Sequence, residues 1–583
     1  MVLFTVTLFL SAALLFAVQP MFAKMVLPLL GGSPATWITS LLFFQVTLLA
    51  GYAYAHWSYR WLGPRRQSLV HGSLLLLGVV SLPVAVPEGW APPATANPVG
   101  WLLVLLVVAV GLPFFVVSST TPLLQRWFAG THHTGAEDPY FLYRASNLGS
   151  MLALLAYPAV IEPGLRLADQ GRLWTGGYLC LVALTAACAV ASWRSPAVGD
   201  SALPEGERSP PTEPLGAARR ARWVALAFVP SSFMLGVTSY VTADIAPVPL
   251  LWIVPLALYL LSFIAVFSRT PFAFYGLMVW VQPLLVLELV LLLLLDVTEP
   301  VLVVVAVHLL AMFVSAVVCH GRLAADRPPP GQLTEFYLWV AVGGALGGLF
   351  NAVVAPLVFD TVVEYPLAIV AACLLRPPAR SPARKVSAAG LVDHLLAAAG
   401  AGMLAVFVLA VGRAVGLGRV ATQLAAFVPA LLLCALFAGR PLRFGMAVAA
   451  VLVAGSLPLL AGGETLYADR SFFGVLRVER DSAAHLHRLV HGNTSHGAQS
   501  TEPHRRREPL AYFHPSGPAG DVLATVPAAA STPQVAVIGL GTGSLACHGR
   551  PGQRWTFYEI DPAVERVARD PRLFTYLRDC PPT

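Results

Sequence analysis

The chain has 583 residues, of which 57% are hydrophobic and 11% are charged, and its net charge is +7. Soluble domains carry about 25% charged residues, so this composition excludes an ordinary soluble enzyme and predicts an integral membrane protein. In such a protein an excess of Lys and Arg is typical of cytoplasmic loops. The sequence has no arginine-rich stripe with interleaved aromatic residues, so we expect no nucleic-acid partner.

Apolar runs long enough to cross a bilayer recur from residue 2 onward. Because a membrane-spanning helix needs roughly 20 mostly apolar residues, the sequence predicts a polytopic α-helical membrane protein with about 14 transmembrane helices. The first run is interpreted as a helix rather than a removed signal peptide. The segment 361–375 is doubtful, because it is short and Asp360 and Glu364 stand at its start. The predicted spans are 2–18, 36–54, 68–86, 101–120, 140–161, 173–193, 223–241, 248–267, 275–295, 300–319, 335–358, 395–412, 418–438 and 442–461.

Basic residues predict the orientation in the membrane. Arginines gather in the loops 55–67, 194–222 and 320–334, whereas the loops 87–100, 242–247 and 296–299 hold no Lys or Arg. This pattern places the N-terminus and the basic loops in the cytoplasm. With fourteen spans the C-terminal part is cytoplasmic, and with fifteen it lies outside. We expect fourteen, because nucleotide-type cofactors are available inside the cell.

Changes in composition divide the chain. A stretch rich in Pro, Ser, Gly and Glu reads as a flexible linker between two helical regions, an organisation seen in transporters. After residue 462 charged and polar residues return, which indicates a soluble tail. The predicted units are a first transmembrane bundle at 1–194, the linker at 195–222, a second transmembrane region at 223–462, a β-hairpin part at 463–530 and a Rossmann-like nucleotide-binding segment at 531–583.

The clearest site signal in the tail is a glycine loop between two predicted strands. The first strand, 535–538, is β-branched and leads into Gly539, Gly541 and Gly543. The second strand, 555–558, ends at Glu559 and Asp561. Glycines allow a tight turn and close approach to a ligand, and an acidic residue about 20 positions on can bind ribose hydroxyls. The pattern favours a nucleotide site over a plain glycine turn.

Cysteine and histidine patterns predict no metal site. Seven cysteines are scattered without a CxxC pair, so neither zinc nor a disulfide framework is indicated. The histidines of the tail match no standard ligand spacing. The glycine loop also lacks the Lys-Ser/Thr of a P-loop, so we expect no ATP hydrolysis.

Several tail segments, in order, resemble the spermidine-synthase (aminopropyltransferase) family, in which a β-hairpin domain precedes a methyltransferase-like fold. The resemblance implies polyamine biosynthesis, a transferase activity and decarboxylated S-adenosylmethionine or S-adenosylmethionine as the cofactor. It places Gly539, Gly541 and Gly543 around the adenosyl-amino-acid part, Glu559 and Asp561 at the ribose end, and Gln499 and Tyr512 near the active site. The segments are "DRSFFGVLRV", "HRLVHGNTSHGAQS", "REPLAYFHPSGPAGD", "VAVIGLGTGSLA" and "WTFYEIDPAVERVA".

The tail departs from that family at three points. Thr542 stands where the family has an aspartate for the aminopropyl amine, and His514 replaces an acid near Tyr512. Forty residues follow Gly543, so we expect the domain to be truncated and catalytically incomplete, with its catalytic residues unknown.

The apolar part resembles bacterial proteins that join a major-facilitator-like membrane region to a spermidine-synthase-like domain. Motifs such as "QPMFAKMVLP" and "LTEFYLWVAVGGALGGLFNAVVAP" carry this resemblance. The alternative function is a small-solute transporter with a regulatory or vestigial nucleotide-binding tail. The glycines at 343–348 predict close helix packing.

The sequence leaves the oligomeric state open. Polar residues in or beside spans are Gln19, Lys24, Gln45, Asn147, Asp244, His308, Glu335 and Asn351.

Overall fold

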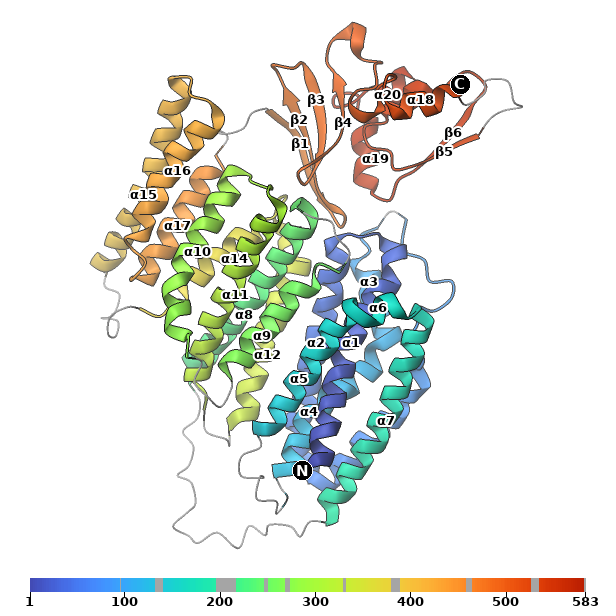
Figure 1. Ribbon diagram of the computed structural model, residues 1–583, viewed down its shortest axis with the longest axis vertical. Coiled ribbons are helices and arrows are strands. Elements are labelled where there is room, and N and C mark those ends of the chain that lie inside the picture. Colours follow the sequence, from blue (N-terminus) through green and yellow to red (C-terminus); the bar gives the residue numbers. More distant parts are fainter. Residues whose placement is uncertain are drawn as a thin grey trace.

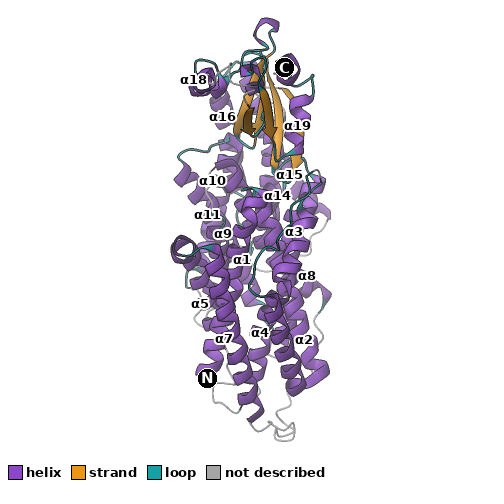
Figure 2. Cartoon of the chain, turned by 90° about the vertical axis from the view of Figure 1, so that its right-hand side faces the viewer, coloured by secondary structure: helices purple, strands orange, loops and turns teal. Residues whose placement is uncertain are grey.

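Two groups of helices stand side by side, and a smaller β-rich tail covers one end of them (Figure 1). Figure 2 shows the strands confined to that end and the N-terminus at the other. The strands therefore form a unit of their own at one end of the helices. The computed structural model describes residues 1–94, 96–129, 131, 140–194, 216–245, 250–267, 273–328, 332–378, 388–457, 464–525 and 534–580; most of the predicted linker, 195–215, lies outside these residues.

In the first bundle, the 45 residues of α2 form two helical legs separated by a kink. Gly63 has φ 69° and Pro64 follows it inside α2, which ends one helical leg and starts another. Gln67 donates hydrogen bonds to the Ala55 carbonyl and the Ser58 hydroxyl; in a straight helix residues 55 and 67 would be about 18 Å apart. The chain therefore reverses here, as the two predicted spans 36–54 and 68–86 require. The elements are α1 (Val2–Leu30), α2 (Pro34–Gly78), α3 (Val99–Leu106), α4 (Leu112–Ala129), α5 (Tyr140–Ala156), α6 (Glu162–Gly164) and α7 (Leu167–Arg194).

The second bundle begins inside the predicted linker, at Ala217. Its helices follow the predicted spans, and π-helical turns extend α8 to Ile245 and α12 to Val354. The glycines of α12 lie against α8: a Cβ added at Gly343 would come within 2.5 Å of the Val224 carbonyl oxygen. Close helix packing there is confirmed. The elements are α8 (Ala217–Tyr240), α9 (Ile253–Val266), α10 (Tyr275–Leu295), α11 (Val301–Ala325), α12 (Leu333–Leu349), α13 (Ala355–Val358), α14 (Glu364–Leu374), α15 (Ala388–Ala414), α16 (Arg419–Ala435) and α17 (Pro441–Gly455).

Length and apolar composition mark nine helices of the described residues as candidate membrane spans, and four shorter apolar helices accompany them. The two legs of α2 count as one in that set. The structure thus supports a many-helix membrane protein, while the number fourteen is not confirmed.

The tail lies at the opposite end of the helices from the N-terminus, whereas the sequence analysis expected both on one side. Ser33, just beyond the end of α1, donates a hydrogen bond to the Phe472 carbonyl of the tail. Met1 is at the other end of this 29-residue helix, about 43 Å away. The same holds for α8, which starts at the basic residues Arg219 and Arg220 and reaches the tail at Asp244. The preferred arrangement, with the N-terminus, the basic loops and the tail on one side, is therefore wrong.

The doubtful segment 361–375 explains the difference. It forms α14, an 11-residue helix about 16 Å long. Glu364 at its start pairs with Arg470 of the tail. Beyond its end, Arg376 donates a hydrogen bond to the carbonyl of Val279, near the start of α10. This helix runs away from the tail face and adds one more reversal to the chain.

The tail is built from two small sheets and a shared core. β1 (Glu464–Ser471), β2 (Gly474–Asp481), β3 (Leu486–His491) and β4 (Thr494–Ser500) form an antiparallel meander, which is larger than the predicted hairpin. β5 (Gln534–Ile538) and β6 (Arg554–Tyr558) pair in parallel, as predicted for the strands around the glycine loop. α19 (Pro562–Arg569) packs its Val564 and Val567 on the meander residues Leu476 and Leu489. Short helices α18 (Pro518–Thr525) and α20 (Tyr576–Asp579) complete the tail.

Candidate functional site

The glycine loop of the tail has the backbone conformation that its sequence predicts. Gly539, Gly541 and Gly543 have φ angles of 89°, 56° and 81°, in the left-handed region that side chains other than glycine seldom adopt. The loop joins β5 to a short 3-10 turn, and the Gly539 amide donates to the Tyr558 carbonyl at the end of β6. The predicted order of strand, glycine loop and strand is therefore present, with the loop lying beside the end of β6.

The carboxylate of Glu559, at the end of β6, accepts hydrogen bonds from nearby backbone amides. Glu559 accepts hydrogen bonds from the Leu540 amide at 2.8 Å and the Asp561 amide at 3.0 Å. Asp561 is buried, caps α19 through the Ala563 amide and accepts a hydrogen bond from Ser471 at 2.7 Å. A ribose would have to compete with backbone donors for Glu559, so this carboxylate has a structural role in the present conformation.

The loop also packs closely against the rest of the tail. A Cβ at Gly541 would come within 2.9 Å of the His496 carbonyl oxygen, and one at Gly543 within 2.9 Å of Leu577. Thr542, which replaces the family's aspartate, is buried against Gly497 of β4. Its hydroxyl has no hydrogen-bond partner among the described residues.

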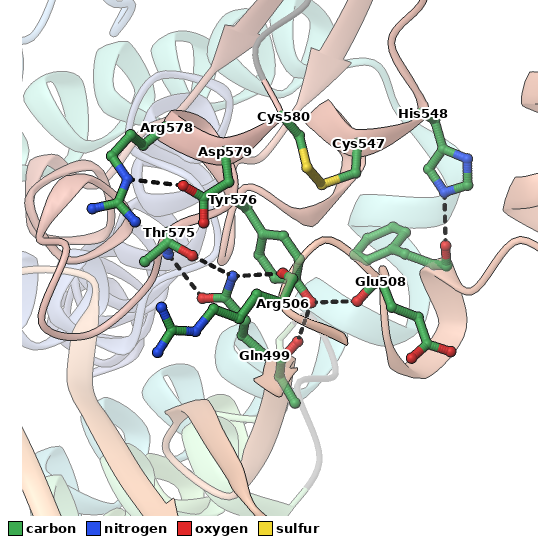
Figure 3. The surroundings of a disulfide bond; sticks show 12 residues. Gln499, Arg506, Glu508, Cys547, His548, Thr575, Tyr576, Arg578, Asp579 and Cys580 are labelled. Atoms are coloured by element: carbon green, nitrogen blue, oxygen red, sulfur yellow. Dashed lines mark hydrogen bonds and ion pairs between the residues drawn. A yellow bond between two sulfur atoms is a disulfide. The ribbon is translucent and has the colours of Figure 1, made fainter. Parts of the chain in front are cut away.

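Gln499 is held inside the tail rather than presented to a ligand (Figure 3). Its carbonyl accepts from the Thr575 amide and its amide donates to the Thr575 hydroxyl, both at 2.8 Å. A further bond reaches the Arg506 carbonyl. The adjacent Tyr576 donates its hydroxyl to backbone carbonyls, among them that of Glu508 at 2.7 Å. This network ties the last helix, α20, to β4.

Tyr512 lies apart from that network. Its side chain is 54% exposed and its ring contacts Phe513 at a centroid distance of 4.4 Å. The neighbouring His514 bonds to Ser516 and Glu508. The structure therefore brings the glycines, Glu559 and Asp561 together, while Gln499 and Tyr512 are engaged elsewhere.

A disulfide joins Cys547, after the glycine loop, to Cys580 (Figure 3). The sequence analysis predicted no disulfide framework, and for this pair it was wrong. The two are the cysteines of the polar tail, whereas Cys188, Cys319 and Cys373 are buried in the helical region. Among the described residues no group of three His, Cys, Asp or Glu side chains could hold a metal ion.

The second candidate site lies between the two bundles, midway along the helices. Gln45 of α2 donates to the Ser231 hydroxyl of α8 at 3.2 Å. Beside it, Asn351 donates to Ser232 at 2.9 Å and to the Gly347 carbonyl at 2.8 Å. The amide oxygens of Gln45 and Asn351 are buried and accept no hydrogen bond within the described residues. Two acceptors without donors therefore lie in the apolar interior.

The ends of the same interface carry other contacts. At the tail end, Trp37 of α2 stacks on Trp252, just before α9, at a centroid distance of 3.5 Å. At the other end, His56 of α2 hydrogen-bonds Thr334 of α12 at 3.1 Å. The polar cluster at Gln45 and Ser231 thus lies between two contacts that join the bundles, one near each end of the helices.

Comparisons with known proteins find similarity among solved structures. No protein-family model and no curated protein matches the chain. Among solved structures, the chain is similar to the xylose transporter XylE from E. coli in an inward-open conformation, at 13% identity and a TM-score of 0.42, over 64% of this chain and 94% of that one. It is also similar to a bacterial homolog of the human lysosomal transporter Spinster, inward-facing and occupied, at 13% identity and a TM-score of 0.36, over 78% of this chain and 94% of that one.

Proposed function

We propose that the chain is a membrane transporter for a small polar solute that carries hydrogen-bond donors. The observation behind this proposal is a pair of buried amide oxygens that accept no hydrogen bond within the described residues. One is on Gln45, which bonds across the two bundles, and the other is on Asn351, on the adjoining helical path of α12. A buried acceptor left without a donor costs about 1–3 kcal/mol. A hydroxyl or ammonium group entering between the bundles would recover that cost, so the interface favours a donor-bearing solute.

The arrangement also supplies what alternating access needs. The Trp37–Trp252 stack lies at the tail face and the His56–Thr334 bond at the opposite face, and each joins one bundle to the other. Opening one contact while the other stays closed would expose the polar cluster to one side at a time. Gln45 and Ser231 would then be reached from either face in turn.

Uptake by the purified full-length chain in proteoliposomes tests this proposal. The probes are labelled putrescine and spermidine as amines, and labelled xylose as a neutral sugar that carries hydroxyl groups. Gln45→Leu and Asn351→Leu should each abolish uptake of the transported probe. Gln423→Leu is the control, because Gln423 is buried like Asn351 but bonds to the Leu294 carbonyl away from this interface. Unchanged uptake in both test variants, or none of the probes taken up by the wild-type chain, contradicts the proposal.

We also propose that the tail faces the extracytoplasmic side of a bacterial inner membrane. Arg65 and Arg66 follow the kink of α2, and Arg219 and Arg220 stand at the start of α8, in each case at the end of the helix away from the tail. Such basic residues favour the cytoplasm. Disulfides persist in oxidising compartments, and the Cys547–Cys580 bond fits that placement. This assignment replaces the expectation of a cytoplasmic tail.

A second candidate function keeps the glycine loop as a site for decarboxylated S-adenosylmethionine or S-adenosylmethionine. The positive φ angles at Gly539, Gly541 and Gly543, with Glu559 at the end of β6, favour it. Aminopropyl transfer to a polyamine would be the matching chemistry. Calorimetry with both ligands tests it: saturable binding that Glu559→Ala removes supports the site, and heats of dilution alone refute it.

A further inference from the structure

The turn between β1 and β2 is wedged into the end of the helical region. Phe472, at the tip of this turn, is 7% exposed and belongs to the same apolar core as Trp37 and Tyr365 of the helices. Phe473 packs beside it. If the tail did not pack against the helices, these two aromatic side chains would be exposed to water. Their burial therefore shows a specific packing contact between the tail and the helical region.

Polar bonds hold the same turn to the second bundle. Arg470 forms two hydrogen bonds with the Glu364 carboxylate, at 2.6 and 3.1 Å, and a third with the Thr361 carbonyl at 2.8 Å. The side chains of Arg470 and Glu364 are only 10% and 2% exposed. A bidentate pair removed from water is geometrically specific, and breaking one partner leaves an uncompensated buried charge.

The first bundle is held from the other side of the tip. Ser33, between α1 and α2, donates to the Phe472 carbonyl at 2.7 Å. Ile560, after β6, lies against Gly31: a Cβ added there would be 3.5 Å from its δ-methyl group. One turn of the tail therefore bonds to both bundles at once.

The next turn of the meander adds a second attachment. Asn493 donates its side-chain amide to Asp296, at the end of α10, at 3.3 Å. Gly492 lies against Asp244, at the end of the α8 helical path, where an added Cβ would be 2.5 Å from a carboxylate oxygen. Both contacts fall on the second bundle.

We propose that these two turns of the tail are a latch, which holds the bundles together at the tail face and must release one of them before this face can open. The inference rests on the proposed transport by two moving bundles. The Trp37–Trp252 stack lies beneath the tip at this face, so the latch and the closure act on the same side. Weakening the latch shifts the population toward conformations open at the tail face.

Spin labels on either side of this face test the latch without any solute. Gly32→Cys and Glu299→Cys place one label on each bundle at exposed positions. Gly32 adjoins Ser33, and Glu299 follows Asp296 by three residues; Ser33 and Asp296 both bond to the tail. Cys180→Ser removes the one exposed free cysteine among the described residues, and the remaining ones are buried. Pulsed electron paramagnetic resonance then gives the distance distribution between the bundles in the full-length chain.

Arg470→Ala should add a longer-distance population that the parent pair lacks. Arg480→Ala is the matched control, since Arg480 pairs with Glu464 on the same sheet where both side chains are exposed, and it should leave the distribution unchanged. If Arg470→Ala cannot be purified, Glu364→Gln removes the same ion pair and should give the same result.

An unchanged distribution in Arg470→Ala and Glu364→Gln overturns the latch. The failure of the transport proposal is distinguishable from this result. If Arg470→Ala shows a longer-distance population but the wild-type chain takes up none of the probes, the latch stands and the transport proposal fails. If the wild-type chain takes up a probe but the distance distribution of Arg470→Ala is unchanged, the transport proposal stands and the latch fails.

Discussion

Removing the disulfide of the tail should lower its stability by an amount that the loop length sets. The bond between Cys547 and Cys580 closes a loop of sequence separation 33. In the chain-entropy description such a cross-link restricts the unfolded chain by about 12.5 cal/mol/K, which is roughly 4 kcal/mol at 25 °C. Substituting both cysteines by serine avoids a stray thiol and should lower the free energy of unfolding of the tail by about 2–4 kcal/mol.

Urea titration of the purified full-length chain measures this loss, with tail unfolding followed by pulse proteolysis. Since urea m-values of small domains are about 1–3 kcal/mol/M, the midpoint should fall by roughly 1–2 M. Cys180→Ser, which lies in α7 of the helical region, should leave the midpoint of the tail unchanged. Equal midpoints for the parent chain and the double variant would refute the reasoning.

The same bond reports the compartment of the tail. Protein precipitated with acid from intact cells and treated with a maleimide polymer should gain two adducts after reduction, relative to the unreduced sample. These are the thiols of Cys547 and Cys580. If the two samples carry equal numbers of adducts and both thiols react without reduction, the tail resides in a reducing compartment and the proposed orientation is wrong.

Two further predictions concern packing and pH. Gly343→Ala should lower the thermal stability of the detergent-solubilised chain by an amount equivalent to about 1–3 kcal/mol, because its Cβ meets the Val224 carbonyl, whereas Gly344→Ala, with open space around the added carbon, should not; equal melting temperatures would contradict this. Burial lowers the pKa of His496, nearby His491 lowers it further and Glu559 raises it. The folded tail then binds fewer protons than the unfolded one, so its stability should be level above about pH 6.5 and should fall as the pH drops below that value. His496→Gln should show a smaller drop in urea midpoint between pH 7.5 and 5.5; an identical drop in the two proteins would exclude this role.

The helical region could be predicted well because each span satisfies a local rule. An apolar run of bilayer length is visible in sequence whatever it packs against, and Gly63–Pro64 marks the reversal inside α2. The length rule failed at α14, an 11-residue helix. Glu364 at its start looked like a reason to exclude the segment from the membrane region. In the structure that charge is buried with Arg470, a partner 106 residues away, which no local pattern reveals.

In the candidate sites, too, features set by neighbouring residues could be predicted from the sequence, whereas contacts between residues far apart in the chain could not. Strand, glycine turn and strand-end acid are consecutive in sequence, so the positive φ angles and the position of Glu559 could be predicted. What these side chains bond to could not. Gln499 is matched to Thr575, 76 residues later, and the Gln45–Ser231 bond joins residues 186 positions apart. A residue's type gives its donors and acceptors, but the fold decides whether they remain free for a ligand.

The contacts of the tail form a continuous path from the glycine loop to the membrane region. Glu559 accepts from the Asp561 amide, and the Asp561 carboxylate accepts from Ser471. Ser471 adjoins Phe472, whose carbonyl bonds to Ser33 between α1 and α2. A ligand that drew the Glu559 carboxylate away from its backbone donors would break its hydrogen bond with the Asp561 amide. The hydrogen bond between Asp561 and Ser471 would connect this change to the turn that carries Phe472. Because linkage is reciprocal, a bundle arrangement that releases the latch would alter ligand affinity at the loop by the same factor. The nucleotide site and the transport proposed above would then be coupled through these contacts, and they would not be rival functions.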